Sequence, residues 1–270
     1  MSLVILTHSD SDHLGNLSEI LERDVDTILW TGRVPAKCRR GGTDCPGTYT
    51  KAASAIGKAT TEGATVINLK TTPLHSGQAF TLGDVEITFL AGWNDFPDAD
   101  GLDDSERENA VSIMSRISYG GHSILVTGDA IGRKRDSHDL NCIGSENWAV
   151  QNVNASLLDA DVLLASHHGA DNGSASCFIA SVTPEYVIFS AGGGHNHPRH
   201  SAAERFIRHG VDPNKMLRTD RGSNSELQEW DDHITSRCGD KAGDDDIDIL
   251  VTAGQKLDIG YIQQDDCPPY

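Results

Sequence analysis

Four side chains able to bind a metal ion fall within six residues near the start of the chain. The sequence HSDSDH places His8, Asp10, Asp12 and His13 directly after the apolar run 3–6. Imidazole nitrogens and carboxylate oxygens both bind Zn²⁺, and carboxylates also suit Mn²⁺. Asp12 alone could instead cap a following helix, but that interpretation leaves both histidines unexplained. We therefore interpret this loop as part of a metal site.

Three later segments repeat the arrangement of a strand followed by potential metal ligands. Their polar residues are Asp129 after 124–128, His167 and His168 after 161–166, and His195 and His197 after 185–194. Strand ends that each deliver such residues converge more plausibly on one site than on several. Two plainer interpretations remain open at this point: Asp129 as a turn residue, and His195 and His197 as caps of the helix that follows them.

The elements that must position these residues alternate between strands and helices. Apolar runs predict strands at 3–7, 26–32, 65–69, 161–166 and 185–193, and hairpins at 78–92, 110–129 and 246–262. Apolar spacing predicts helices at 14–24, 46–63, 146–158 and 201–210, the last with a capping box from Ser201 to Glu204. The acidic stretch 95–108 reads as a loop. This pattern indicates an α/β (α+β) fold with packed sheets and outer helices.

Composition restricts the classes of function. The chain has 270 residues and a net charge of −18, which disfavours tight, non-specific binding to long duplex DNA. We expect a single domain over 1–270 with a polar insertion near 222–246, and no membrane span. No signal peptide is visible, which slightly favours the cytoplasm. The six cysteines leave disulfides and free thiols equally open.

The order of the motifs HxDxDH, TGD, SHHG and GHxHP resembles the metallo-β-lactamase fold superfamily. Within it, the chain is most similar to the hydrolase domain of the competence protein ComEC and its stand-alone relatives. The resemblance covers residues 3 to about 220 and resumes in the last hairpin. It implies a four-layer αββα sandwich, and a hydrolase that uses one or two Zn²⁺ ions or Mn²⁺ in their place.

The resemblance also implies a ligand set. By position, His8 and Asp10 match the ligands of one metal, Asp12, His13 and His168 match those of the other, Asp129 matches the bridging ligand, and His167 is an orienting or alternative ligand. The usual middle histidine is absent, and Asn109 is the nearest residue to its place. We therefore expect the metal at His8 and Asp10 to be held more weakly.

The implied reaction is hydrolysis by metal-activated water, with Asp12 orienting the water and His195 or His197 binding a phosphate or protonating the leaving group. A phosphodiester in a small molecule or a short nucleic acid is the expected substrate. One alternative is a β-lactamase or lactonase that cleaves a cyclic amide or ester. The other is a degenerate, non-catalytic member of the fold.

One departure from the family pattern concerns the front of the chain. Family members have about two more strands before the HxDxDH strand, whereas this sequence starts on that strand. We expect strand 3–7 to be central in its sheet and its neighbours to be left uncovered. Self-association into a homo-oligomer, or a longer natural gene product, would then bury the exposed apolar surface. The hairpin 246–262 could cover part of the gap instead.

Overall fold

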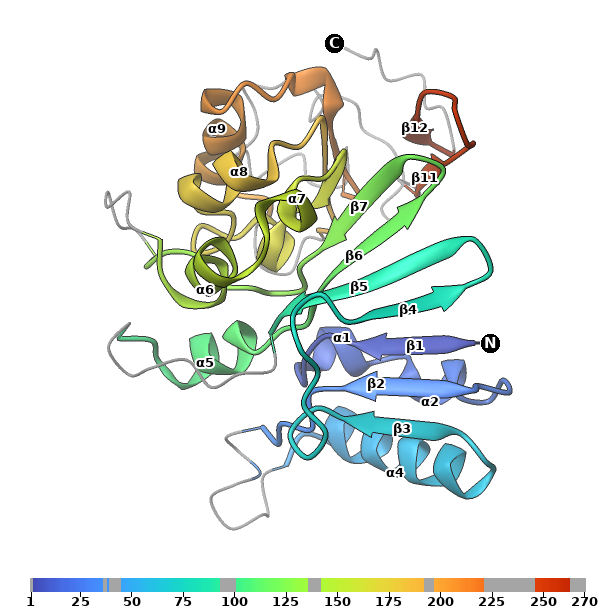
Figure 1. The fold of residues 1–270 in the computed structure, drawn as a ribbon. Helices are drawn as coiled ribbons and strands as arrows, with labels where there is room; N and C mark the ends of the chain where they lie inside the picture. Colours follow the sequence, from blue (N-terminus) through green and yellow to red (C-terminus); the bar gives the residue numbers. More distant parts are fainter. Residues whose placement is uncertain are drawn as a thin grey trace.

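The computed structural model describes residues 2–35, 38, 45–92, 101–135, 142–191, 197–220 and 246–262. Its first sheet is parallel, in the order β1 (Leu3–Leu6), β2 (Thr27–Trp30), β3 (Thr65–Asn68). Figure 1 shows three helices on one side of this sheet: α1 (Ser11–Leu14), α2 (Leu17–Ile20) and α4 (Gly47–Thr61).

The second sheet has seven strands and mixed directions. Its order is β10 (Met216–Arg218), β9 (Tyr186–Phe189), β8 (Val162–Leu164), β7 (His122–Val126), β6 (Met114–Tyr119), β5 (Val85–Ala91), β4 (Ala79–Leu82). Strands β4 to β7 run antiparallel, and β7 to β10 run parallel. The helices beside it are α6 (Gly144–Asn152), α7 (Ala155–Leu158), α8 (Ser176–Val182) and α9 (His200–Arg208) (Figure 1).

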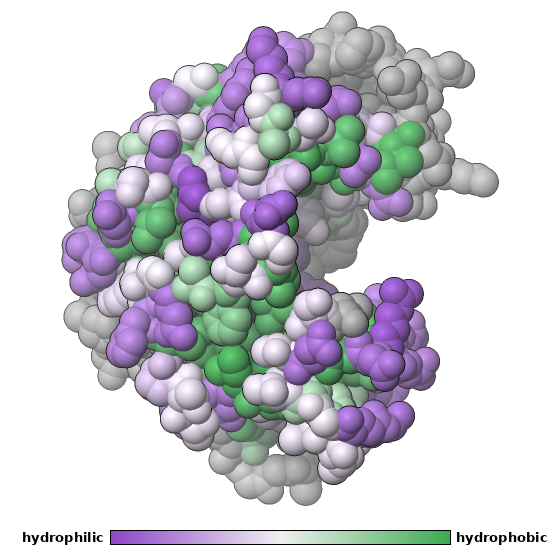
Figure 2. Space-filling view, turned by 45° about the vertical axis from the view of Figure 1, so that its right-hand side comes forward, coloured by the Kyte–Doolittle hydropathy of each residue, from purple (hydrophilic) through white to green (hydrophobic). Residues whose placement is uncertain are grey.

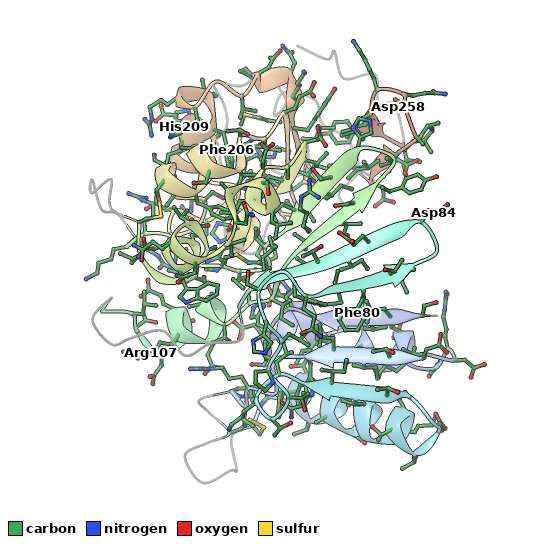
Figure 3. All side chains as sticks on the ribbon, viewed as in Figure 1. Phe80, Asp84, Arg107, Phe206, His209 and Asp258 are labelled. Carbon is green, nitrogen blue, oxygen red and sulfur yellow. A yellow bond between two sulfur atoms is a disulfide. The ribbon has the colours of Figure 1, made fainter. Side chains whose placement is uncertain are left out.

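Apolar clusters join the layers. Leu29, Phe89 and Ile113 belong to the cluster between the two sheets, and all three are fully buried. Phe80 meets Phe89 edge to face, with 5.2 Å between the ring centroids, and Figure 3 shows Phe80 at the boundary between the sheets. Two more clusters bind each sheet to its own helices. The predicted mixed fold, with packed sheets and helices outside, is confirmed.

The position of β1 differs from the prediction. We expected this strand to be central, but it lies at the edge of the first sheet. Within the described part of the chain, its backbone ladder is with β2 alone, from Leu3 opposite Thr27 to Leu6 opposite Trp30. The apolar composition of 3–6 arises from packing on two faces, because Leu3 and Ile5 face the second sheet and Leu6 faces the helices.

The inner face of the second sheet is incompletely covered. Leu125 and Leu163 point toward the helices and are fully buried, whereas Ile124, Val126 and Leu164 point the other way and are partly exposed. Figure 2 shows a hollow in the surface with apolar residues beside it. The expected uncovered surface beside β1 is not seen on its partner strand, because Ile28 and Leu29 of β2 are fully buried, and self-association stays a prediction.

Three local predictions were wrong. The helix expected at 14–24 is divided into α1 and α2, because Gly15 and Asn16, both weak helix formers, interrupt it. The expected loop 95–108 contains a helix, α5 (Asp104–Ala110), which begins with a capping box of Asp103 and Glu106. The capping box at Ser201 does not form, because its hydroxyl donates to Asp171 instead.

The closing hairpin forms as predicted, from β11 (Ile247–Leu250) and β12 (Asp258–Tyr261). It is a separate two-stranded sheet near the ends of β6, β7 and β10. The Tyr261 hydroxyl accepts from Arg218 N at 3.1 Å, and His122 Nε2 lies 2.6 Å from Gln255 O. The hairpin therefore contacts the second sheet. The predicted insertion near 222–246 lies, except for its last residue, outside the described residues.

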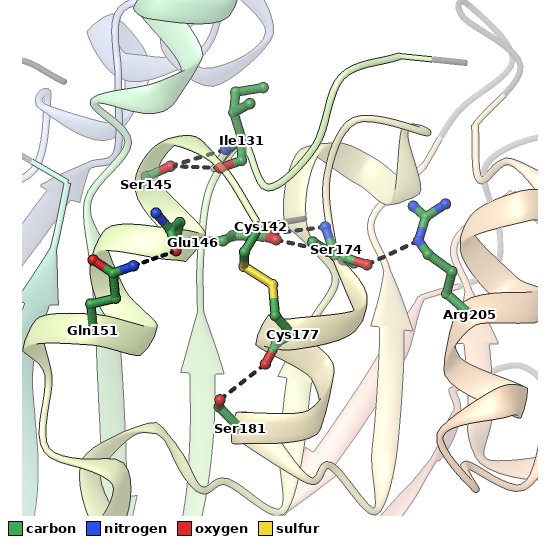
Figure 4. Close-up of a disulfide and its surroundings, with 11 residues drawn as sticks. Ile131, Cys142, Ser145, Glu146, Gln151, Ser174, Cys177, Ser181 and Arg205 are labelled. Carbon is green, nitrogen blue, oxygen red and sulfur yellow. Dashed lines mark hydrogen bonds between the residues drawn. A yellow bond between two sulfur atoms is a disulfide. The ribbon is translucent and has the colours of Figure 1, made fainter. Parts of the chain in front are cut away.

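Among the described residues, four cysteines form two disulfides, Cys38–Cys45 and Cys142–Cys177. The second joins the segment before α6 to α8, beside the buried carboxylate of Glu146 (Figure 4). That carboxylate accepts hydrogen bonds from Ser174 N and Ala175 N, both at 2.7 Å, and so fixes the loop that follows the SHHG motif.

None of the helices among the described residues has the length and hydropathy needed to cross a membrane.

Candidate metal centre

The candidate ligands come from the ends of three strands. His8 follows β1, and Asp129 follows β7. His167 and His168 lie in a short 3-10 turn, Ser166–Gly169, which follows β8. Because β7 and β8 are parallel neighbours, their carboxyl ends lie at the same edge of the sheet. The first sheet packs against the second and brings the end of β1 to this edge.

Gly128 allows Asp129 to enter the site. Gly128 has a φ of +53°, in a backbone conformation that L-residues rarely adopt. A Cβ at this position would also lie 2.9 Å from Thr7 Cβ and 3.0 Å from Ser112 Cβ. Asp129 N then donates to Ser112 Oγ at 3.0 Å. The glycine of the TGD motif is therefore required by both backbone conformation and close packing.

The two oxygens of the buried Asp129 carboxylate face different groups of residues. Oδ1 lies 3.0 Å from His13 Nε2 and 3.4 Å from His168 Nε2. Oδ2 lies 3.6 Å from His8 Nε2 and 3.7 Å from His167 Nε2. One carboxylate thus stands between two pairs of imidazoles, which is the geometry of a bridging ligand.

The group on the Oδ1 side is compact. One donor atom from each of Asp12, His13, Asp129 and His168 lies within 4.8 Å of all the others. His13 Nε2 is 3.2 Å from His168 Nε2, and Asp12 Oδ2 is 3.3 Å from His168 Nε2. His168 Nδ1 donates to Ser190 O at 2.6 Å, which leaves Nε2 toward the cluster. Four such donors match a tetrahedral cation site.

The group on the Oδ2 side is more open. His8 Nε2 is 4.0 Å from Asp10 Oδ2, and the Asp10 side chain is partly exposed. His167 Nε2 is also 3.2 Å from Asn109 Nδ2, and His167 Nδ1 is 2.8 Å from Asn172 Oδ1. Asn109, at the end of α5, therefore reaches the site through His167.

Burial and mutual charge shift the titration of these groups. Burial raises the pKa of Asp129, but the hydrogen bond from His13 and the charge of His8 outweigh it and hold this pKa well below the ordinary value. Burial lowers the pKa of His8 to about 3. Burial and the charge of Asp12 raise the pKa of Asp10 to about 6. The site therefore keeps the Asp129 carboxylate ionised beside the neutral, buried imidazole of His8.

The pair formed by Asp12 and His168 behaves differently. The hydrogen bond with His168 lowers the pKa of Asp12 to about 2. Burial lowers the pKa of His168, but the hydrogen bond with Asp12 outweighs it, and the pKa rises to about 9. Without a cation, a proton therefore holds this ion pair together at neutral pH.

Two buried polar atoms at the site also indicate that its donors fit a metal ion. His8 Nε2 and Asn109 Oδ1 are buried and have no hydrogen-bond partner among the described residues. Buried polar atoms are normally satisfied, so such atoms at the edge of a cluster of acids and imidazoles indicate a position for a cation or its water. The chemistry of the donors, imidazole nitrogen with carboxylate oxygen, suits Zn²⁺ or Mn²⁺.

The structure brings together most of the residues selected from the sequence. His8, Asp10, Asp12, His13, Asp129, His167 and His168 all line one site. His197 lies at its margin, with its ring centroid 5.9 Å from that of His167. His195 lies outside the described residues. The alternative interpretation of Asp129 as a plain turn residue is not supported by its contacts.

Some residues near the site were not found from the sequence. Asn172 and Ser190 orient His167 and His168, and Glu108 approaches Ser9 and Arg33, at 3.4 Å from the Ser9 hydroxyl and 3.5 Å from Arg33 Nε. Only the asparagine in "HHGADN" offered a local signal, because it follows the histidine pair closely.

Comparisons with known proteins were consistent with this geometry. Residues 2–193 match the family model described as "Metallo-beta-lactamase superfamily". The competence protein ComA of Neisseria gonorrhoeae is 33% identical over 115 residues, which cover 42% of this chain and 14% of that protein. ComE operon protein 3 of Bacillus subtilis (strain 168) is 26% identical over 223 residues, which cover 82% of this chain and 24% of that protein. The chain thus spans at most about a quarter of these relatives.

Solved structures with similar folds include the metallo-beta-lactamase fold protein YhfI from Bacillus subtilis, which is 14% identical with a TM-score of 0.39, over 80% of this chain and 72% of that one. Another is an isothiocyanate hydrolase from Delia radicum gut bacteria, at 11% identity and a TM-score of 0.44, with the same coverage of 80% and 72%.

Proposed function

Since the chain belongs to the metallo-beta-lactamase superfamily, we propose that it is a metal-dependent hydrolase of phosphodiester bonds with two adjacent cation positions. The division of the Asp129 carboxylate between two donor groups carries this proposal. In two-metal hydrolases the ions lie about 3.5–4 Å apart and share ligands of this kind. A single structural ion would need only one of the two groups.

The proposed ligands form two groups, according to which oxygen of Asp129 they lie closest to. Asp12, His13 and His168, together with Asp129, would hold one cation. His8 and Asp10, together with the same carboxylate, would hold the other. Zn²⁺ suits both positions, and Mn²⁺ is compatible with the carboxylates that each position contains.

When bound, a pair of divalent cations lowers the pKa of a shared water toward 7 and stabilises negative charge on a phosphoryl group. The chain's own groups orient the reactants. Asp12 is half exposed and ionised, so it is placed to accept a hydrogen bond from that water. His197 at the margin is a candidate to bind a phosphate oxygen or protonate the leaving group, and His195 is a second candidate on sequence grounds.

The substrate class follows from charge as well as from the site. A chain with a net charge of −18 repels extended phosphate backbones, so we propose small phosphodiesters or short single-stranded nucleic acids as substrates. Two cations at the site would locally reverse this repulsion for one phosphate group.

The test is a panel of substrates with the metal-free protein reloaded with Zn²⁺ or Mn²⁺. We expect hydrolysis of bis-p-nitrophenyl phosphate, and no comparable turnover of nitrocefin or of an acyl lactone. Preferential turnover of nitrocefin or the lactone would replace the phosphodiesterase proposal with the cyclic amide or ester alternative. Absence of turnover together with absence of bound metal would support the non-catalytic alternative.

A further inference from the structure

We propose that His167 binds the second cation, at the position where the superfamily pattern has a middle histidine and this chain has Asn109. This inference rests on the dinuclear centre proposed above and assigns its missing ligand. The aligned motifs offer one ligand from SHHG, which is His168. The structure instead places both histidines of this motif on the same carboxylate.

Distances between donor atoms support a shared cation. His167 Nε2 and His8 Nε2 lie 3.7 and 3.6 Å from Asp129 Oδ2. Ligand bonds of 2.0–2.1 Å in a tetrahedral site put neighbouring donors about 3.3 Å apart. The two distances to Asp129 Oδ2 therefore exceed this spacing by only a few tenths of an ångström.

The hydrogen bonds of His167 fix the tautomer that a ligand needs. Its Nδ1 lies 2.8 Å from the amide oxygen of Asn172, which can only accept, so the proton belongs on Nδ1. The lone pair of Nε2 then points toward Asp129. His168 has the equivalent arrangement with Ser190 O. Orienting hydrogen bonds of this type accompany most metal-binding histidines.

The backbone of the SHHG turn serves the same purpose. His167 and His168 both have left-handed conformations, with φ of 53° and 57°, which residues other than glycine rarely adopt. In consequence, two consecutive rings reach the two different oxygens of one carboxylate. Strained backbone of this kind is concentrated at functional sites.

Asn109 explains how the position is held when no cation is bound. Its Nδ2 lies 3.2 Å from His167 Nε2 and donates to the lone pair that a cation would use. Its Oδ1 is buried and makes no hydrogen bond to any described residue. Binding of a cation would displace this amide hydrogen and leave the unpartnered oxygen available to a metal-bound water. A purely structural role for His167 would not require an unsatisfied atom here.

The experiment counts bound ions and does not depend on activity. Metal-free wild type, His167→Gln, His168→Gln and His209→Gln are titrated with Co²⁺, and its d–d absorption and equilibrium dialysis report stoichiometry. His209 is exposed and distant from the site, so it is the matched control (Figure 3). We expect wild type and His209→Gln to bind two ions. His167→Gln should bind one, because its affinity for the weaker ion should fall by about a hundredfold. His168→Gln should lose the tighter ion.

Two ions in His167→Gln with unchanged affinities would overturn this inference and leave the dinuclear proposal standing. Fewer than two ions in wild type would overturn both. A second pair of variants leaves His167 in place, so it tests the inference even where replacing His167 prevents folding. Asn172→Leu should weaken the second ion by about 10–100-fold, and Asn172→Asp, which keeps the acceptor, should retain it. Equal affinities in both variants would contradict the role of His167.

Discussion

His13 Nε2 lies 3.0 Å from Asp129 Oδ1, although the two residues are 116 positions apart and follow strands of different sheets. This contact connects the loop after β1 with the loop after β7. It requires the two sheets to pack face to face, so that the end of one strand from each meets at a common edge. The candidate metal centre is therefore a product of the sandwich, and neither sheet contains it alone.

Asp129→Asn should remove both cations, because the shared carboxylate serves both donor groups and an amide is a much weaker ligand. We expect metal content measured by mass spectrometry to fall from two ions per chain to fewer than one. Hydrolysis of bis-p-nitrophenyl phosphate should fall on the order of a hundredfold or more. Asp258→Asn is the control, because Asp258 is exposed and lies far from the site (Figure 3). Retention of both ions would exclude a bridging role.

The two cations should differ in affinity. The donors around Asp12, His13 and His168 form a compact group within 4.8 Å, whereas Asp10 lies 4.0 Å from His8 and is partly exposed. Titration of the loaded protein with a chelator should therefore release one equivalent well before the second. Release of both equivalents in a single step would contradict this difference.

Metal affinity should rise with pH. The hydrogen bond with Asp12 outweighs burial and raises the pKa of His168 from 6.5 to about 9, so a cation must displace a proton from this imidazole. One displaced proton predicts about a tenfold gain in affinity per pH unit between about pH 6 and pH 8. Calorimetry in buffers of different ionisation enthalpy would measure the released proton. An affinity independent of pH would contradict the prediction.

The metal-free protein should show the opposite trend in stability. Because the pKa of His168 is higher in the folded state, its ion pair stabilises the fold fully below about pH 6.5, and this contribution is lost as pH rises through about 9. The melting temperature of the metal-free protein should therefore fall over this interval. Asp12→Asn should flatten the curve, and an unchanged slope in that variant would show that another group is responsible.

The exposed edge of β1 should promote self-association. Edge strands present unpaired backbone groups, and Ile124, Val126 and Leu164 on the second sheet are partly exposed apolar residues. Sedimentation of the 270-residue chain over a wide range of concentration should show a mass that increases with concentration. A monomer at every concentration, with a cooperative melt, would show that the chain covers this surface itself.

The sequence was sufficient to predict the strand-end residues and the order of elements. Apolar runs that stop at polar residues are local patterns, so β1, β7 and β8 and the candidate ligands after them could be predicted without structural information. The hairpin turn at Gly120 and Gly121 could also be predicted, because a two-residue turn needs positive φ angles that glycine adopts easily. Both glycines have positive φ in the structure.

Other features depend on contacts that no local pattern contains. The edge position of β1 is decided by strand pairing, and the capping box at Ser201 fails because Asp171, 30 residues away, accepts its hydroxyl. The direction of the His167 ring depends on Asn172 and on a left-handed turn. His167 could be selected from the sequence as a candidate ligand, but its position in the site follows only from these contacts.

Anomalous diffraction from crystals of the protein loaded with Zn²⁺ or Mn²⁺ would show whether two cations share the Asp129 carboxylate. We expect two anomalous peaks, one on either side of this carboxylate and about 3.5–4 Å apart. One peak should lie among Asp12, His13 and His168, and the other beside His8 and Asp10. A single peak that does not touch Asp129, or no peak in this cluster, would contradict this expectation.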